Sequence, residues 1–229
     1  MEFFFKGKTM TARAFYAQIK PFMVPLVLFA ALGLLSSCSL FEAKHHPVVS
    51  CAPPVEEPQS DLPYIAVNYQ YPLAAVCNPQ LYVYKSKRRL LLVQDRVLIR
   101  DYRIGLGPSP AGDKVFQGDG RTPEGDFYVC VKNPSSNFYK SLGLSYPEKR
   151  HAERALIAGN ISSDEFARIV QAVNSRNRPP WNTVLGGAIF LHGGGAFGDW
   201  TKGCVALNNS SMDELFQVVN VGTPVHILP

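Results

Sequence analysis

Residues 189–207 place one histidine and one cysteine at the two ends of a glycine-rich loop. The stretch reads IFLHGGGAFGDWTKGCVAL, with His192 and Cys204 twelve positions apart. A cysteine attacks carbonyl carbons as its thiolate, and a nearby imidazole accepts its proton or stabilises the anion. Because the ordinary thiol pKa of about 8.5 limits reactivity at neutral pH, such a cysteine needs a partner. We identify Cys204 and His192 as a candidate nucleophile and base. The alternative is a small buried cysteine and a hydrogen-bonded histidine at a strand end.

Apolar runs on both sides of the loop must position these two side chains. We interpret 187–193 and 203–207 as neighbouring antiparallel strand ends, which would bring His192 and Cys204 into contact. More short runs rich in Val, Leu, Ile and Tyr predict antiparallel strands at 80–86, 88–94, 96–107, 125–133 and 224–229.

Two segments have helical spacing instead. Residues 162–176 and 209–219 repeat apolar side chains as amphipathic helices do, with Ser163 and either Ser210 or Ser211 as N-caps. The expected fold class is therefore mainly β, with a few helices at its margin.

The first 37 residues have the composition of a signal peptide. Basic residues precede the run PFMVPLVLFAALGLLSSC, in which two prolines disfavour a stable membrane-spanning helix. Its end, LSSC, resembles the bacterial lipoprotein signal, which implies cleavage after residue 37 and acylation of Cys38. Because Ser39 follows the cysteine, the resemblance favours the periplasmic face of the outer membrane. An ordinary secretory signal cut elsewhere is the alternative.

Residues 38–63 are rich in proline and lack apolar periodicity, which predicts a tether before a domain at 64–229. His45 and His46 lie in this tether without further metal ligands at useful spacing. The net charge of +5 falls to +2 once residues 1–37 are removed, so nucleic acid is not an expected partner. We interpret the basic run at 85–89 as a solvated strand end.

The stretch HGGGAFGDWTKGCVAL resembles the active-site signature of the YkuD-type L,D-transpeptidases, in which His-Gly precedes a variable loop and a Ser/Thr-x-Gly-Cys segment. The segments KSKRRLLLV, YRIGLGPSPAGDKVFQGDGRTPEGDFYV and SLGLSYP also resemble the family, so the likeness covers roughly residues 80–229. It implies the β-sandwich or barrel of this family's catalytic domain, and a reaction without metal or cofactor.

Carried over residue by residue, the resemblance implies that Cys204 is the nucleophile and His192 the general base. The carbonyl of Gly193 would orient the imidazole. The backbone amides of Gly203 and Cys204 are the candidate oxyanion donors.

The resemblance also suggests substrate-binding residues. Thr201 fills the Ser/Thr position, and Trp200 is a candidate floor for a substrate groove. Many family members have histidine at the position of Lys202 and arginine at that of Ala206. Lys202 retains a cation that would lower the Cys204 pKa or hold a substrate carboxylate, whereas Ala206 removes a bidentate clamp.

The implied reaction is acyl transfer on peptidoglycan. Cys204 would form a thioester with the third stem residue, normally diaminopimelate, and release the terminal D-alanine. An amine from a second stem, a free D-amino acid or a murein-bound lipoprotein would then cleave the thioester. If water does so, the protein is a hydrolase that trims tetrapeptides or cuts lipoprotein from the wall. A lipid-anchored protein that only binds peptidoglycan is the third alternative.

The remaining acids and thiols receive structural interpretations. Asp119, Glu124 and Asp126 lie in GDGRTPEGDF, which predicts a glycine and proline hairpin rather than a metal site. For an exported protein we expect a disulfide between Cys77 and Cys130, because both belong to the domain whereas Cys51 lies in the tether.

Overall fold

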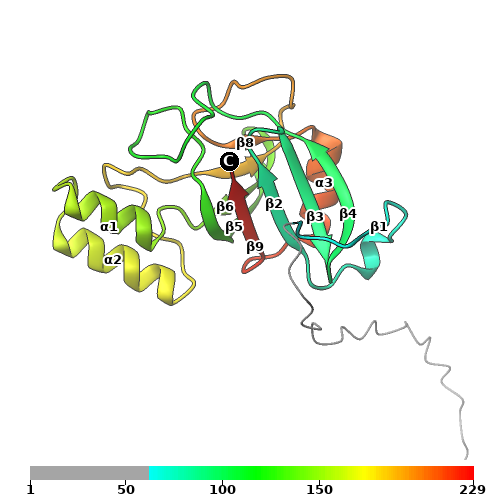
Figure 1. The fold of residues 1–229 in the computed structure, drawn as a ribbon, viewed down its shortest axis with the longest axis horizontal. Coiled ribbons are helices and arrows are strands. Elements are labelled where there is room, and N and C mark those ends of the chain that lie inside the picture. The colour runs from blue at the N-terminus through cyan, green and yellow to red at the C-terminus, as the bar shows by residue number, and fades with distance from the viewer. Residues whose placement is uncertain (1–61) are drawn as a thin grey trace, which may run out of the picture. The chain divides into compact units, whose positions relative to one another are not determined.

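The structure is a computed structural model that describes residues 62–229, and its main feature is one mixed sheet of nine strands (Figure 1). The strands are β1 (Ala66–Val67), β2 (Gln80–Tyr84), β3 (Arg89–Gln94), β4 (Val97–Arg103), β5 (Gly125–Ser136), β6 (Tyr139–Leu144), β7 (Phe190–His192), β8 (Val205–Ala206) and β9 (Pro224–Leu228). The helices are η1 (Leu73–Ala75), α1 (Lys149–Ile157), α2 (Ser163–Asn174) and α3 (Asn209–Val218). The expected signal peptide, Cys38, His45, His46 and all but the last two residues of the expected tether lie outside the described residues.

Every run predicted as a strand contains one, so the mainly β fold class is confirmed. The sheet order is β1-β4-β3-β2-β9-β5-β6-β7-β8. Gly105, just after β4, exchanges two backbone hydrogen bonds of 2.9 and 2.8 Å with Ala206 of β8. The edge strand β8 therefore meets the end of β4, which lies next to the opposite edge strand β1. This contact gives the sheet the barrel-like closure expected from the resemblance.

The core lies between this curved sheet and α3, which runs behind β3 and β4 in Figure 1. Alternate side chains of β2 and β9 point into it, as the period of two in a strand requires. One stripe of α3 covers them, spaced three residues apart. The buried side chains are Leu81, Val83, Val225 and Ile227 from the strands and Met212, Leu215 and Val218 from α3.

The helix caps differ from the predicted ones. Ser162, not Ser163, caps α2: its hydroxyl accepts the N–H of Glu165, whose carboxylate accepts the N–H of Ser162. This capping box was readable as S-x-x-E in the sequence. Asn208, rather than Ser210 or Ser211, precedes α3. Helix α1 was not predicted. It packs against α2 at one side of the sheet in Figure 1, where the two helices share a small apolar core.

The predicted Cys77–Cys130 disulfide is wrong. Cys130 is a free thiol in β5, and Cys77 is disulfide-bonded to a cysteine other than Cys130 or Cys204, both of which are free. Cys77 lies just before β2, and β9 separates β2 from β5 in the sheet. Two strand spacings amount to about 9.5 Å, whereas a disulfide requires Cα atoms within about 7 Å.

None of the helices in residues 62–229 is long and apolar enough to cross a membrane.

Candidate active site

The candidate pair lies on two adjacent strands that are parallel, not antiparallel as predicted. His192 is the last residue of β7, and Cys204 directly precedes β8. The register pairs Leu191 with Val205 and His192 with Ala206. Cys204 is therefore level with Phe190, two positions before His192, and both side chains emerge on the same face. The intervening loop returns the chain to the start of the neighbouring strand, as a parallel pairing requires.

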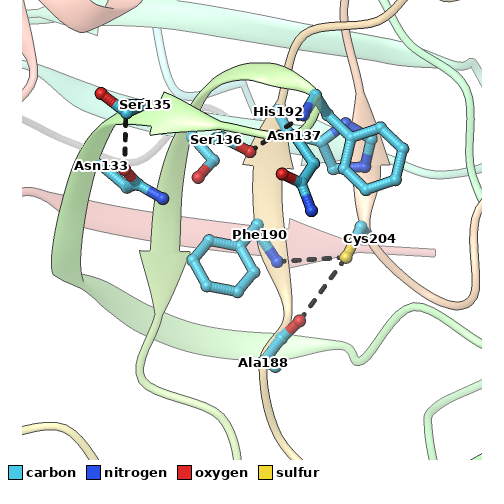
Figure 2. Close-up of a pocket in the computed structure, with 10 residues that line it drawn as sticks. Asn133, Ser135, Ser136, Asn137, Ala188, Phe190, His192 and Cys204 are labelled. Atoms are coloured by element: carbon cyan, nitrogen blue, oxygen red, sulfur yellow. Dashed lines mark hydrogen bonds between the residues drawn. The ribbon is translucent and has the colours of Figure 1, made fainter.

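His192 and Cys204 line one pocket of about 360 Å³ (Figure 2). The other walls come from the β5–β6 hairpin and from the segment that leads into β7. Apart from the candidate pair, no titratable side chain of the described residues lines it. The lining residues are Asn133, Ser135, Ser136, Asn137, Phe138, Ser141, Ala188, Phe190, His192 and Cys204.

The imidazole of His192 is oriented by its own neighbour. Its Nδ1 lies 2.6 Å from the carbonyl oxygen of Gly193, so Nδ1–H donates and Nε2 is left as the proton acceptor. The contact expected from the resemblance is thus present. Burial lowers the pKa of His192, and the bond to Gly193 offsets part of this effect. At neutral pH the ring is uncharged and can accept a proton.

The thiol of Cys204 is held between two backbone groups, which Figure 2 shows as dashed lines. The N–H of Phe190 donates to Sγ at 3.4 Å, and the thiol donates to the carbonyl of Ala188 at 3.6 Å. Burial raises the pKa of Cys204, while the Phe190 N–H and the charge of Lys114 act in the opposite direction. Both shifts favour the uncharged forms, a thiol on Cys204 and a neutral imidazole on His192.

Thr201 braces the turn before Cys204 instead of lining the pocket. Its hydroxyl accepts the N–H of Gly203 at 3.1 Å and donates to the carbonyl of Cys204 at 2.7 Å. Gly203 has φ +117°, and a Cβ there would lie 2.6 Å from the carbonyl oxygen of Arg121, so only glycine fits.

Since the Gly203 N–H already donates to the Thr201 hydroxyl, it is not a free oxyanion donor. The Cys204 N–H meets no acceptor within residues 62–229 and remains the candidate.

The lysine whose charge acts on the Cys204 pKa is Lys114, which was not predicted. Lys202 is exposed and makes no hydrogen bond or ion pair within the described part of the chain. Lys114 is only 3 % exposed and pairs with Asp119 at 2.7 Å, and its charge offsets part of the rise in the Cys204 pKa that burial causes. Nothing in the sequence singled out Lys114.

Ala206 is fully buried at the bridge that closes the sheet, where an arginine side chain would have no room.

Aromatic rings surround the candidate base. Trp200 lies with its ring centroid 5.6 Å from that of His192 and donates its indole N–H to the Gly195 carbonyl at 3.1 Å. It does not line the pocket. Phe138 does, at 4.7 Å from His192, and Ser141 lies directly opposite His192 on β6. Sequence reasoning missed both, although NPSSN at 133–137 is a readable hairpin turn that would have placed them together.

The three acids of GDGRTPEGDF do not form a cluster. Asp119 pairs with Lys114, Glu124 with Lys85 at 2.8 Å, and Asp126 with His226 at 2.6 Å. Within residues 62–229 no group of three or more potential metal ligands comes together. Each of these carboxylates forms its own ion pair and links a different part of the fold.

Several solved structures are similar to this chain. Pgp2 from Campylobacter jejuni, a helical cell shape determining protein, is 18 % identical with a TM-score of 0.44, and the match covers 70 % of this chain and 55 % of that one. An L,D-transpeptidase from Xylanimonas cellulosilytica is 17 % identical with a TM-score of 0.40, covering 66 % and 60 %. One from Mycobacterium smegmatis is 12 % identical with a TM-score of 0.39, covering 66 % and 59 %. The chain thus spans little more than half the length of these proteins.

A search of curated proteins finds no match. A family model does: YkuD, described as the L,D-transpeptidase catalytic domain, matches residues 78–227, which is well over half of the chain and includes His192 and Cys204. The chain therefore belongs to the YkuD family of L,D-transpeptidase catalytic domains.

Proposed function

We propose that this protein is a cysteine-dependent L,D-transpeptidase that transfers peptidoglycan stem peptides to an amine. One observation carries the proposal: Gly193 fixes the His192 ring so that Nε2 is free to accept a proton, in the same pocket as the Cys204 thiol. Membership of the family supports peptidoglycan stems as the substrate.

In the first half-reaction the Cys204 thiol attacks the carbonyl carbon of the third stem residue and gives its proton to His192 Nε2. The N–H of Cys204 donates to the oxyanion that forms. When the tetrahedral intermediate collapses, the bond to the terminal D-alanine breaks, and its amine leaves with the proton from His192. The product is a thioester on Cys204.

In the second half-reaction an acceptor amine attacks the thioester. His192 takes a proton from the amine, the new amide forms, and the Cys204 sulfur leaves and recovers a proton from the imidazolium. The walls of the pocket other than the pair are neutral amides, hydroxyls and aromatic rings. Among these lining residues only His192 can activate a nucleophile, and an amine attacks a thioester more readily than water does, so we favour transfer over hydrolysis.

We further propose that Cys38 carries a lipid that anchors the protein to the periplasmic face of the outer membrane. The support is the LSSC sequence after a basic and apolar leader. The anchor would bring the catalytic domain to the wall, where acceptor stems, and any murein-bound lipoprotein, are abundant.

The deciding experiment incubates the full-length chain with disaccharide tetrapeptide and analyses the products by mass spectrometry. Crosslinked dimers, or exchange of the terminal D-amino acid, would support transfer. Tripeptide alone, even with added acceptor, would make the protein a hydrolase. If the products of the wild type equalled those of Cys204→Ala, the catalytic proposal would be wrong and a binding role would remain.

A further inference from the structure

Three aromatic rings, which we call the aromatic ledge, form a cluster beside His192: Phe138, Trp200 and Phe197. Phe138 and Trp200 lie 4.7 and 5.6 Å from the His192 ring and 5.6 Å from each other. Phe197 stacks on Trp200, with the ring centroids 5.6 Å apart and the ring planes only 7° apart. The ledge is therefore continuous with the wall of the catalytic pocket.

The outer ring of the ledge is exposed without being on a loose segment. Phe197 is 74 % exposed, although burying a phenylalanine side chain is worth about 1.5–3 kcal/mol. The loop that carries it is fastened at three points. Trp200 donates to the Gly195 carbonyl, and Asp199 forms an ion pair of 2.6 Å with Arg88 and accepts the N–H of Leu106. A rigidly presented aromatic ring beside a reactive pocket is typical of a recognition surface.

Amide donors lie next to the ledge. Asn208 and Asn209 each use Oδ1 to accept a loop N–H, from Ala196 at 3.1 Å and from Gly194 at 2.9 Å. Both side chains are exposed, and their Nδ2 groups meet no acceptor within residues 62–229. Flat apolar rings with neutral amide donors beside them fit a ligand that has an apolar face and a rim of acceptors. A pyranose ring with hydroxyl and acetamido groups has this character.

The outer ring of the ledge lies within reach of a stem bound at the candidate site. Three stem residues lie between the sugar and the carbonyl that Cys204 would attack, and they span about 10 Å when extended. Trp200 lies 5.6 Å from His192 and Phe197 lies 5.6 Å from Trp200, so Phe197 is within about the length of such a stem from His192. A stem that reaches Cys204 can thus leave its sugar over the outer part of the ledge.

We propose that Phe197, which stacks on Trp200, binds a sugar ring of the glycan strand by stacking, so that the protein recognises stems still attached to glycan. This inference rests on the proposed function for the identity of the substrate. The contact adds binding energy at a distance from the reacting atoms, and it selects wall-attached stems over free peptides.

The test compares disaccharide tetrapeptide with the same tetrapeptide lacking sugar, using the full-length chain. For Phe197→Ala we expect the ratio of kcat/KM for the two substrates to fall about tenfold, mainly through the KM of the sugar-bearing one. Phe197→Trp should retain the wild-type ratio. Tyr69→Ala, which removes an aromatic ring that is 52 % exposed near β1, is the matched control and should also leave the ratio unchanged. An unchanged ratio in Phe197→Ala would overturn the proposal.

A second measurement is independent of catalysis and so separates this proposal from the proposed function. Cys204→Ala is titrated with the peptide-free disaccharide, and tryptophan fluorescence is followed. We expect a saturable change that weakens about tenfold when Phe197→Ala is added. If no saturable change occurs, the ledge does not bind sugar, whatever the activity of the wild type. If the fluorescence change occurs but the wild type has no transpeptidase activity, the proposed function fails and the glycan site stands.

Discussion

The hydroxyl of Thr201 holds the turn that presents Cys204, and replacing Thr201 with valine tests this role. Oγ1 accepts the Gly203 N–H at 3.1 Å and donates to the Cys204 carbonyl at 2.7 Å. Thr201 is only 5 % exposed, and valine has nearly the same volume without the hydroxyl. Thr201→Val therefore removes both hydrogen bonds with little change in packing.

The expected loss of stability follows from these two bonds. A hydrogen bond contributes about 1 kcal/mol net, and a buried donor left without an acceptor costs about 1–3 kcal/mol. The Gly203 N–H becomes such a donor in Thr201→Val. We expect the free energy of unfolding to fall by about 2–4 kcal/mol, measured by urea denaturation with an unchanged m value.

The same substitution loosens the peptide unit whose N–H we propose as the oxyanion donor. We expect kcat to fall about tenfold at constant KM, which is less than the hundredfold or more that follows complete loss of a donor. Thr201→Ser keeps the hydroxyl and is the matched control, with wild-type kcat and a loss of about 1 kcal/mol for the missing methyl group. If Thr201→Val were as stable and as active as Thr201→Ser, the bracing role would be refuted.

Four other predictions concern the thiols and charges. Cys204→Ala and His192→Ala should each remove nearly all transfer activity, and the double variant should be little worse. If the loss of activity in the double variant equalled the product of the two single losses, a joint role would be contradicted. A carbapenem should form a covalent adduct with the wild type but not with Cys204→Ala, as measured by intact-protein mass spectrometry. Burial lowers the pKa of His192 and raises that of Cys204. We therefore expect kcat/KM to fall with decreasing pH only below about 6.5, where the imidazole becomes protonated. A thiolate absorbance at pH 7 that is absent from Cys204→Ala would argue against a neutral thiol and imidazole. Lys114→Met leaves Asp119 buried without its cation and should destabilise the fold by about 3–5 kcal/mol in urea denaturation, with Asp119→Asn in the same background restoring part of the loss. Cys38→Ala should move from the membrane to the soluble fraction on cell fractionation, whereas a variant that still sedimented wholly with membranes would exclude Cys38 as the anchor.

Much of the fold could be predicted from the sequence, because local patterns determine local structure. Strand-like runs at 80–86, 88–94 and 224–229 contain β2, β3 and β9, and apolar spacing located α2 and α3. The capping box at Ser162 was also readable, although the prediction was one residue off. The resemblance to the family was readable from the motif around His192 and Cys204 and from three further segments, each a short local pattern. These signals lie within a few residues of one another, so no knowledge of distant contacts is needed to find them.

The order of the strands could not be predicted in this way. The C-terminal strand β9 inserts between β2 and β5, with Val225 opposite both Leu81 and Phe127. That insertion separates Cys77 from Cys130 and made the predicted disulfide wrong. The same holds for the parallel pairing of β7 with β8, because apolar periodicity specifies which face of a strand is buried but not its neighbour or its direction.

The sequence by itself determined which residues are chemically equipped for the reaction, since a cysteine, a histidine and the glycines of one loop are close along the chain. Only the tertiary structure decided what surrounds them. Folding brings Lys114 near Cys204 and Phe138 against His192, across separations in sequence that leave no periodic signal. It also assigns the Thr201 hydroxyl to the Gly203 N–H and leaves Lys202 in solvent. Burial and hydrogen bonding set the charge state of the pair, and both depend on the whole packed fold rather than on the motif.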